Sequence, residues 1–299
     1  MTELASFKYA ARVAYMGENY AGWQRQERRI HAPDAVLGPL GPSQRQPSPD
    51  SGGPALGIQQ VLEEALSRFS SSPVRVTGAG RTDKGVHALG QVTSFELERE
   101  WAPERLRLAV NFYLPEDVRV MRVFPVAADF DARRSALWRE YRYFVWHGWV
   151  CPPHLNGRVW WRKSDWDMNL ARSACRLLEG EHDFRAFCRT GECPERSVRT
   201  LSRVRLQRWG GMSVLTVRAP SFLMNMVRIL VGNIDAVART HWSSPGGERR
   251  PLSWLEGLLS GGERSDSAMT APACGLWFWR AAYRDLPEMK GPFGMSIPI

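Results

Sequence analysis

Two short strands joined by a charged loop are predicted by the stretch Val74-Arg-Val-Thr-Gly-Ala-Gly-Arg-Thr-Asp-Lys-Gly-Val-His-Ala-Leu-Gly-Gln-Val-Thr-Ser-Phe-Glu-Leu97. We expect the strands at 74–77 and 91–97, where β-branched and aromatic residues gather. The glycine-rich segment between them carries a single carboxylate, Asp83. This strand–loop–strand unit lies in the middle of a longer pattern of strands and helices.

Hydrophobic spacing predicts a strand and a helix before this unit, and a helix and a strand after it. Residues 7–15 alternate between apolar and polar side chains, which is the period of a half-buried strand. Apolar residues recur at three- and four-residue steps between Ile58 and Phe69, and a second helix carries Leu106, Ala109 and Val110. A strand at 118–123 completes a β-α-β-β-α-β order.

The second half of the chain repeats this order, although the halves share no visible sequence identity. The predicted elements are a strand around Tyr141, Tyr143 and Val145, a helix over 168–178, strands at 201–206 and 214–217, a long helix from near Ser221, an extra helix at 252–259 and a last strand at 276–282. The predicted fold class is therefore α+β, with two ferredoxin-like or RRM-like halves. They form a mostly antiparallel sheet with helices on one face and a basic active-site cleft.

We place the N-terminal half at 1–125, the C-terminal half at 126–285 and a tail at 286–299. Within the first half, the segment 27–56 is rich in Pro, Ser, Gly and Gln and has few large apolar residues. Such a composition buries too little apolar surface to offset the conformational entropy of the chain. We therefore expect a disordered insertion there.

Composition favours a protein that binds a polyanion. The 299 residues are 43% hydrophobic, and 40 Lys and Arg against 31 Asp and Glu give a net charge of +9. Nucleic acid is the expected partner, because the arginine fork suits phosphate; a solvated basic face without a partner is the alternative. No apolar run of membrane length and no signal or transit composition is seen, so we expect a cytoplasmic protein that makes no membrane contact.

Cysteine usage favours reduced thiols. The five cysteines are scattered and odd in number, which does not suit a disulfide framework. Cys151, His154, Cys188 and Cys193 are the alternative as a zinc site, but the ligands of zinc sites usually lie in closer pairs along the sequence. We therefore predict no bound metal.

Asp83 is the candidate nucleophile. Gly80 and Gly85 can bend the chain tightly around it, and Arg81 or another arginine would keep its carboxylate ionised. An aspartate that only caps a turn is the competing interpretation. A phosphate-binding glycine loop is excluded, because Asp83 stands where the dinucleotide fingerprint needs glycine and the Gly-Lys-Ser/Thr of a P-loop is missing.

Arg228 and Tyr141 are candidate partners of Asp83. Arg228 is the only cation within an otherwise apolar helix, so it requires an anion; Asp83, another acidic residue or solvent could satisfy it. In the strand Arg139-Glu-Tyr-Arg-Tyr143, tyrosines share one face and charged residues the other, and an aromatic side chain among arginines can stack a nucleobase. For a strand taken alone, the preferred interpretation is that both tyrosines are ordinary core residues. His87 could relay a proton, although a structural imidazole that bonds the loop backbone is the preferred interpretation.

Several motifs then occur in the order typical of one enzyme family. They are Tyr15-Met-Gly-Glu-Asn-Tyr-Ala-Gly-Trp-Gln-Arg-Gln26, Gly80-Arg-Thr-Asp-Lys-Gly-Val-His-Ala88, Asp129-Phe-Asp-Ala-Arg133, Arg142 with its flanking tyrosines, Gly180-Glu-His-Asp-Phe184 and Phe222-Leu-Met-Asn-Met-Val-Arg228. Through these motifs, from about Phe7 to Tyr283, the chain resembles the tRNA pseudouridine synthase A family, whose members modify the anticodon stem-loop.

The resemblance implies an isomerase that converts uridines at tRNA positions 38, 39 and 40 to pseudouridine. It implies that Asp83 is the nucleophile, Tyr141 stacks on the base, Arg228 pairs with Asp83, and Arg81 displaces the uridine. The expected substrate-binding residues are Tyr141, Leu276, Lys84, His87 and Arg142. The resemblance also implies a homodimer in which one tRNA touches both subunits, with no metal and no cofactor.

Three features depart from the family pattern. Met16 stands where many relatives have aspartate, Lys84 stands where alanine is common, and the 27–56 insertion is long. None of these three departures falls on an expected catalytic position. We therefore expect them to affect which uridines are modified and not the reaction itself. Alternatives to the tRNA isomerase are a noncatalytic RNA-binding module or chaperone, a synthase acting on another RNA, and an Asp-dependent hydrolase. The hydrolase would need a second carboxylate or a metal cluster.

Overall fold

The computed structural model describes residues 6–25, 55–240, 248–284 and 286, which form two compact units. The first unit contains the described residues up to Ala136 and those from Arg280 onward, and the second is Leu137–Trp279. Of the predicted insertion 27–56 only residues 55 and 56 are described, and of the predicted tail only 286. The predicted boundary after residue 125 precedes the division between the units, which follows Ala136.

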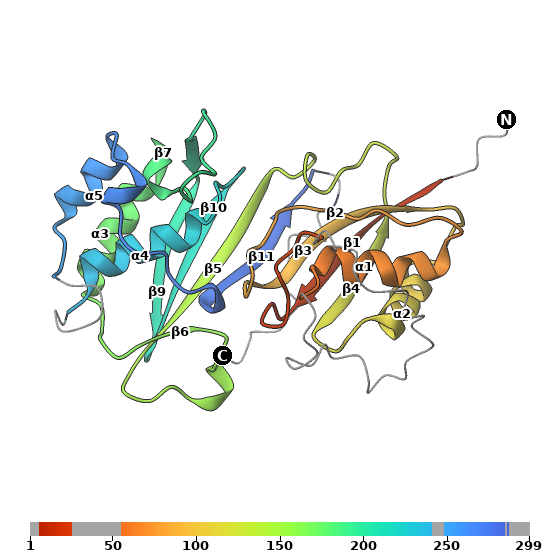
Figure 1. The fold of residues 1–299 in the computed structure, drawn as a ribbon, viewed down its shortest axis with the longest axis horizontal. Coiled ribbons are helices and arrows are strands. Elements are labelled where there is room, and N and C mark those ends of the chain that lie inside the picture. The colour runs from red at the N-terminus through yellow and green to blue at the C-terminus, as the bar shows by residue number, and fades with distance from the viewer. Residues whose placement is uncertain (1–5, 26–54, 241–247, 285, 287–299) are drawn as a thin grey trace, which may run out of the picture. The chain divides into compact units, whose positions relative to one another are not determined.

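The first unit has the predicted β-α-β-β-α-β order. Its elements are β1 (Phe7–Tyr15), α1 (Ile58–Leu66), β2 (Thr77–Gly78), β3 (His87–Leu97), α2 (Pro103–Tyr113) and β4 (Val118–Pro125). The strand order is β4-β1-β3, with β2 paired to β3, and every one of these pairings is antiparallel. Helices α1 and α2 cover one face of this sheet (Figure 1).

The second unit repeats this arrangement. Its elements are β5 (Trp138–His147), β6 (Trp160–Arg162), α3 (Met168–Leu178), β7 (Gly180–Asp183), β8 (Val198–Leu201), β9 (Arg203–Trp209), β10 (Met212–Ala219), α4 (Met226–Ala238), α5 (Leu252–Leu259) and β11 (Leu276–Ala282). The strand order β11-β5-β10-β9 corresponds to β4-β1-β3-β2 of the first unit, so both units are ferredoxin-like. The fold prediction is confirmed, and the last residues of β11 belong to the first unit.

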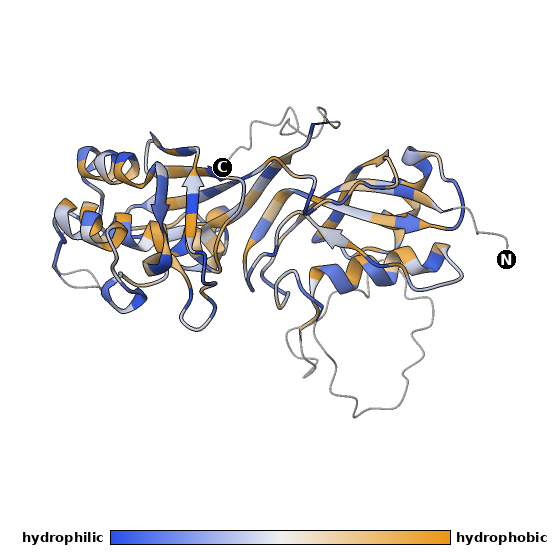
Figure 2. Cartoon of the chain, turned by 90° about the horizontal axis from the view of Figure 1, so that it is seen from above, coloured by the Kyte–Doolittle hydropathy of each residue, from blue (hydrophilic) through white to orange (hydrophobic). Residues whose placement is uncertain are grey.

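Apolar periodicity accounts for the core of each unit. Strands alternate between hydrophobic and hydrophilic residues along their length (Figure 2), as expected when one face is covered by helices. Helix α4 has no comparable exposed side, because every residue in it except Arg228 is buried. Among the described residues, none of the helices has the length and hydropathy that crossing a membrane requires.

Several predicted boundaries differ from the observed ones. The strand expected at 74–77 is reduced to Thr77–Gly78, whereas β3 begins at His87 because pairing with β1 extends to Tyr15 opposite Ala88. Helix α4 begins at Met226 rather than near Ser221, because Asn225 has left-handed backbone (φ 61°) and cannot continue a helix.

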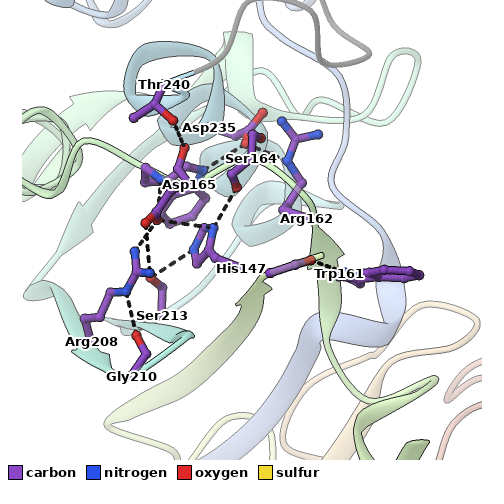
Figure 3. A network of polar contacts seen from close by, with 12 residues as sticks. His147, Trp161, Arg162, Ser164, Asp165, Arg208, Gly210, Ser213, Asp235 and Thr240 are labelled. Carbon is purple, nitrogen blue, oxygen red and sulfur yellow. Dashed lines mark hydrogen bonds and ion pairs between the residues drawn. The ribbon is translucent and has the colours of Figure 1, made fainter. Parts of the chain in front are cut away.

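A network of buried charges links β5, β6 and α4 in the second unit (Figure 3). Asp235 of α4 is 1% exposed and accepts a hydrogen bond from Trp166 Nε1 at 2.9 Å. Arg162 Nε lies 3.1 Å from Asp235 Oδ1, as an ion pair without an aligned hydrogen bond, and Arg239 Nη2 lies 3.6 Å from Oδ2. Asp235 therefore compensates two arginines that are themselves buried.

His147 occupies a second part of this network. Its Nδ1 lies 3.0 Å from the Ser164 carbonyl oxygen, which can only accept, so Nδ1 carries the proton and Nε2 accepts from Ser213 Oγ at 3.0 Å. Asp165 Oδ1 is 3.7 Å from Nδ1, and Arg208 pairs with the same Asp165. Burial is the main cause that lowers the pKa of His147, and the Arg208 charge adds to it.

Replacement of Asp235 by asparagine tests the buried ion pairs. Asp235→Asn keeps the shape but removes the carboxylate charge that compensates the buried Arg162 and Arg239, so we expect a loss of about 3–5 kcal/mol in the free energy of unfolding. Urea denaturation measures this loss. The control Glu256→Gln, at an exposed position of α5, should be nearly neutral. Equal stability of the two variants would contradict the proposed role of Asp235.

Stability should also depend on pH through His147. Because burial lowers its pKa in the folded state, the unfolded chain binds the proton more readily, so stability should fall as pH drops below about 6.5. We expect the free energy of unfolding to change less between pH 7.5 and 5.5 in His147→Gln than in wild type. Identical pH dependence in both proteins would show that His147 does not contribute.

Candidate active site

Asp83 stands at the first position of a tight turn in the first unit. The Val86 N–H donates to the Asp83 carbonyl at 3.1 Å, and Gly85 has φ +79°. A positive φ at the third residue is typical of a type II turn, and this third position favours glycine. The expected bend at Gly85 is thus confirmed, whereas Gly80 does not adopt a positive φ. The Asp83 side chain is half-buried.

The backbone preceding Asp83 is anchored from two sides. The Trp23 N–H donates to the Thr82 carbonyl at 2.9 Å, and Gln91 Nε2 donates to the Gly80 carbonyl at 2.6 Å. Tyr15 and Thr82 share a buried hydrogen bond of 2.8 Å between their hydroxyl groups. Burial raises the pKa of Tyr15 to about 12, so this contact stays uncharged near neutral pH. The loop therefore holds Asp83 on a fixed backbone.

Two glycines let the turn after β1 approach the Asp83 loop. A Cβ on Gly22 would lie 2.7 Å from the Thr82 carbonyl oxygen, and Gly22 has φ +105°. A Cβ on Gly17 would lie 2.1 Å from the Val86 carbonyl oxygen. Any larger residue would collide with backbone at both positions. This close approach explains the glycines in the motif that begins at Tyr15.

His87 supports the loop from the inside of the unit. Its side chain is fully buried, and its Nδ1 accepts a hydrogen bond from the Gly17 N–H at 3.1 Å. The imidazole thus bonds the turn after β1, whereas the sequence predicted a bond to the backbone of the Asp83 loop. Arg81 and Lys84 lie on either side of Asp83 in the sequence, and both side chains are exposed.

Arg228 is held within the second unit by the chain that precedes β11. Its Nε donates to the Ala271 carbonyl at 2.8 Å, and the Ala271 N–H donates to the Arg228 carbonyl at 3.1 Å. This chain lies against α4 at Gly232, where a Cβ would be 1.9 Å from the Met269 carbonyl oxygen. These two hydrogen bonds hold both the backbone and the Nε atom of Arg228 in place. The Arg228 side chain is half-buried.

Tyr141 and Arg142 lie on opposite faces of the sheet in the second unit. Tyr141 is opposite Val217, whereas Arg142 is opposite Thr216. Tyr141 is 7% exposed, so it is not the exposed aromatic residue that the strand pattern allowed. Its ring stands nearly perpendicular to those of Phe222 and Phe278, with both centroids 5.0 Å away.

Arg142 and Leu276 occupy separate surroundings in the same unit. The Arg142 guanidinium lies 3.9 Å from the centre of the Trp279 ring and 3.7 Å from Glu140 Oε1. Glu140 is fully buried and accepts from Arg218 Nε at 3.1 Å. Leu276 begins β11 and is 6% exposed.

The predicted site residues thus fall into two groups. The first unit brings Arg81, Asp83, Lys84 and His87 together in one loop, and the second unit holds Tyr141, Arg142, Arg228 and Leu276 on β5, α4 and β11. Each group is rigidly supported by its own unit. Within the part of the chain that the structure describes, no cluster of three or more His, Cys, Asp and Glu side chains could hold a metal ion.

Comparison with known proteins decides the family. A family model described as tRNA pseudouridine synthase matches residues 44–133 and 174–284. The "tRNA pseudouridine synthase A" of Pseudoalteromonas atlantica is 33% identical over 293 residues, covering 97% of this chain and 98% of the relative. That of Rhodospirillum rubrum is 37% identical over 279 residues, covering 92% and 87%. The chain belongs to the tRNA pseudouridine synthase family.

Membership in the synthase family confirms the resemblance drawn from the motifs, and it makes the protein an isomerase. A crystal structure of a Cbf5–Nop10–Gar1 complex is 12% identical, with a TM-score of 0.28 over 75% of this chain and 52% of that chain. This similarity is too weak to add to the description of the fold.

Sequence reasoning missed the residues that support Asp83 from neighbouring elements. Gln91 was recognised only as the start of a strand, although its side chain bonds the loop backbone. Gly17 and Gly22 lie in the motif that begins at Tyr15, but the sequence alone shows no physical reason why these two positions must be glycine. A polar residue predicted to be buried at a strand end beside a loop is the signal that would have singled out Gln91.

A methyl group at Gly22 should displace the Asp83 loop. Gly22→Ala places a side chain at φ +105° and against the Thr82 carbonyl, so we expect a loss of about 1–3 kcal/mol in stability and at least a tenfold loss in kcat. Urea denaturation and single-turnover kinetics measure these effects. The control Gly257→Ala, in α5 with no neighbouring atom within 4 Å of the added methyl group, should keep full activity.

Proposed function

We propose that this protein converts uridine to pseudouridine in the anticodon stem-loop of tRNA, at positions 38, 39 and 40, with Asp83 as the nucleophile. The observation that carries this proposal is the turn that holds Asp83. Its backbone is fixed by Trp23, Gln91 and Gly85, so the carboxylate does not have to be ordered when substrate arrives. Family membership supplies the reaction class.

The reaction is an isomerisation, so atoms and electrons balance without a co-reactant. The bond between N1 of uracil and C1′ of ribose breaks, the uracil turns in the site, and C5 bonds to C1′. The C5 proton then leaves, with Tyr141 or water as the acceptor, and N1 takes up a proton in its place. Asp83 attacks either C1′ of ribose or C6 of uracil, and both routes use the same carboxylate.

Residues of both units support this chemistry in the proposal. Arg228 pairs with Asp83 and keeps its carboxylate ionised, which suits a guanidinium whose Nε is already held by the Ala271 carbonyl. A base inside the stem must be extruded, at a cost of a few kcal/mol, and stacking on Tyr141 would offset about 1–3 kcal/mol of it. Phe222 and Phe278 hold the Tyr141 ring in one orientation for this role.

The remaining predicted residues act on the rest of the tRNA. Arg81 displaces the uridine from the stem, and Lys84 and Arg142 contribute positive charge toward phosphate. Leu276 lines the uracil pocket, and His87 supports the loop that meets the substrate. The proposed assembly is a cytoplasmic homodimer that needs neither metal nor cofactor, and it rests on the family resemblance.

A tritium-release assay tests the role of Asp83. A tRNA transcript tritiated at C5 of uridine is mixed with wild type, with Asp83→Asn or with Glu116→Gln. This control changes the charge of an exposed turn in the same unit. We expect wild type and Glu116→Gln to release tritium equally and Asp83→Asn to release none, because an amide is not a nucleophile here. Mapping of the modified uridines tests positions 38, 39 and 40.

Three other outcomes would change the conclusion. Release by Asp83→Asn at the wild-type rate would exclude Asp83 as the nucleophile. Tight tRNA binding without release by any of the proteins would favour the noncatalytic RNA-binding module. Faster release from a different RNA than from tRNA would favour a synthase with another substrate.

A further inference from the structure

Two of the five cysteines flank a tight turn in the second unit. The Glu192 N–H donates to the Arg189 carbonyl at 3.0 Å, and Gly191 has φ +78°, which together define a type II turn over 189–192. Cys188 directly precedes this turn and Cys193 directly follows it. The turn reverses the chain and brings the residues on its two sides next to each other.

The two thiols are neighbours across the turn. Cys188 has extended backbone as it enters the turn, and the nearby Cys193 thiol contributes to raising the pKa of Cys188. A turn of this type brings the Cα atoms of its first and fourth residues within about 7 Å of each other, and Cys188 and Cys193 flank these two positions. This proximity is the geometric basis for a bond between the two sulfurs.

Burial separates the roles of the two thiols. Cys193 is exposed, so a small oxidant in solution can reach its sulfur. Cys188 is 1% exposed, and burial, followed by the neighbouring Cys193, raises its pKa to about 11. Cys188 therefore lies behind Cys193 as a protonated thiol, and it has to lose its proton as it attacks an oxidised Cys193.

We propose that Cys188 and Cys193 form a modification site at which hydrogen peroxide converts the two thiols to a disulfide. Cys193 Sγ attacks the peroxide, the O–O bond breaks, and one water leaves, so Cys193 becomes a sulfenic acid. Cys188 Sγ then attacks Cys193 Sγ and the S–O bond breaks. The departing hydroxide takes the Cys188 proton as a second water. The thiols lose two electrons and the peroxide gains them.

The other three cysteines lie in different surroundings. Cys175 is buried in α3, where burial raises its pKa to about 12. The Cys151 thiol donates to the Pro152 carbonyl at 3.7 Å, and the Cys274 thiol donates to the Val159 carbonyl at 3.4 Å. These three cysteines provide matched controls for reaction at the turn.

The site is attached to the segment that leads into α4. The Arg189 N–H donates to the Met224 carbonyl at 3.1 Å. Contact with this ordered segment holds Cys188 in place beside Cys193. The proposal does not depend on the proposed isomerisation, because it concerns only the thiols and their neighbours.

Peptide mapping after oxidation tests the site. Full-length protein is treated with hydrogen peroxide, remaining thiols are alkylated, and the protein is digested with trypsin without reduction. Cleavage after Arg189 separates the two cysteines, so a disulfide joins peptide 186–189 to peptide 190–196. We expect this joined pair in wild type and in Cys175→Ser, lighter by two hydrogen atoms than the separate thiol peptides, and its loss on treatment with dithiothreitol.

Single substitutions decide between the outcomes. In Cys188→Ser we expect Cys193 to stop at the sulfenic acid, which dimedone captures, and in Cys193→Ser we expect Cys188 to stay a thiol. Circular dichroism spectra establish that both variants are folded. Equal capture of Cys193 by dimedone in wild type and Cys188→Ser, without joined peptides, would overturn the proposal. So would joining only between chains, shown by mixing 15N-labelled and unlabelled protein.

Discussion

The close backbone contact between the turn after β1 and the Asp83 loop is the constraint on which the first unit depends. Gly22 packs its Cα against the Thr82 carbonyl, and the Trp23 N–H bonds the same oxygen. The carbonyls of Gly22 and Trp23 also accept from the N–H groups of Ile58 and Gln59. These donors begin α1 and would otherwise lack helical partners. One short turn therefore fixes both the start of a helix and the position of the candidate nucleophile.

Helix α4 has the corresponding role in the second unit. Arg228 and Asp235 are seven residues apart, which places them on the same side of the helix two turns from each other. Asp235 is held in the buried network of Figure 3, and Arg228 is held by the chain that returns along α4. One helix thus carries both the buried Asp235 charge and Arg228, the residue proposed to pair with Asp83.

Hydrophobic periodicity was sufficient to predict most elements and the fold class, but not features set by tertiary contacts. The strand at 7–15 and the helix at 252–259 have the predicted bounds, because their apolar spacing is regular. Residues 74–76 are not in a strand, despite favourable residue types. Asp83 was found through its glycines and motif. Gln91 bonds Gly80 across the Asp83 loop, and its place at a strand end beside that loop was the local signal. The buried Asp235 pairs with Arg162, which lies far away in the sequence, and no local pattern reveals such a pair.

Amide hydrogen exchange of Trp23 and Val86 tests most directly whether the protein holds Asp83 on a rigid loop. Their N–H groups bond Thr82 and Asp83, the two carbonyls that define the loop. In the wild-type protein without RNA, both amides should exchange as slowly as that of Val92 in the middle of β3, because all three would open only when the unit unfolds. Exchange of Trp23 and Val86 at the rate of an unstructured chain, with Val92 still protected, would show that the loop is not held and would contradict this account.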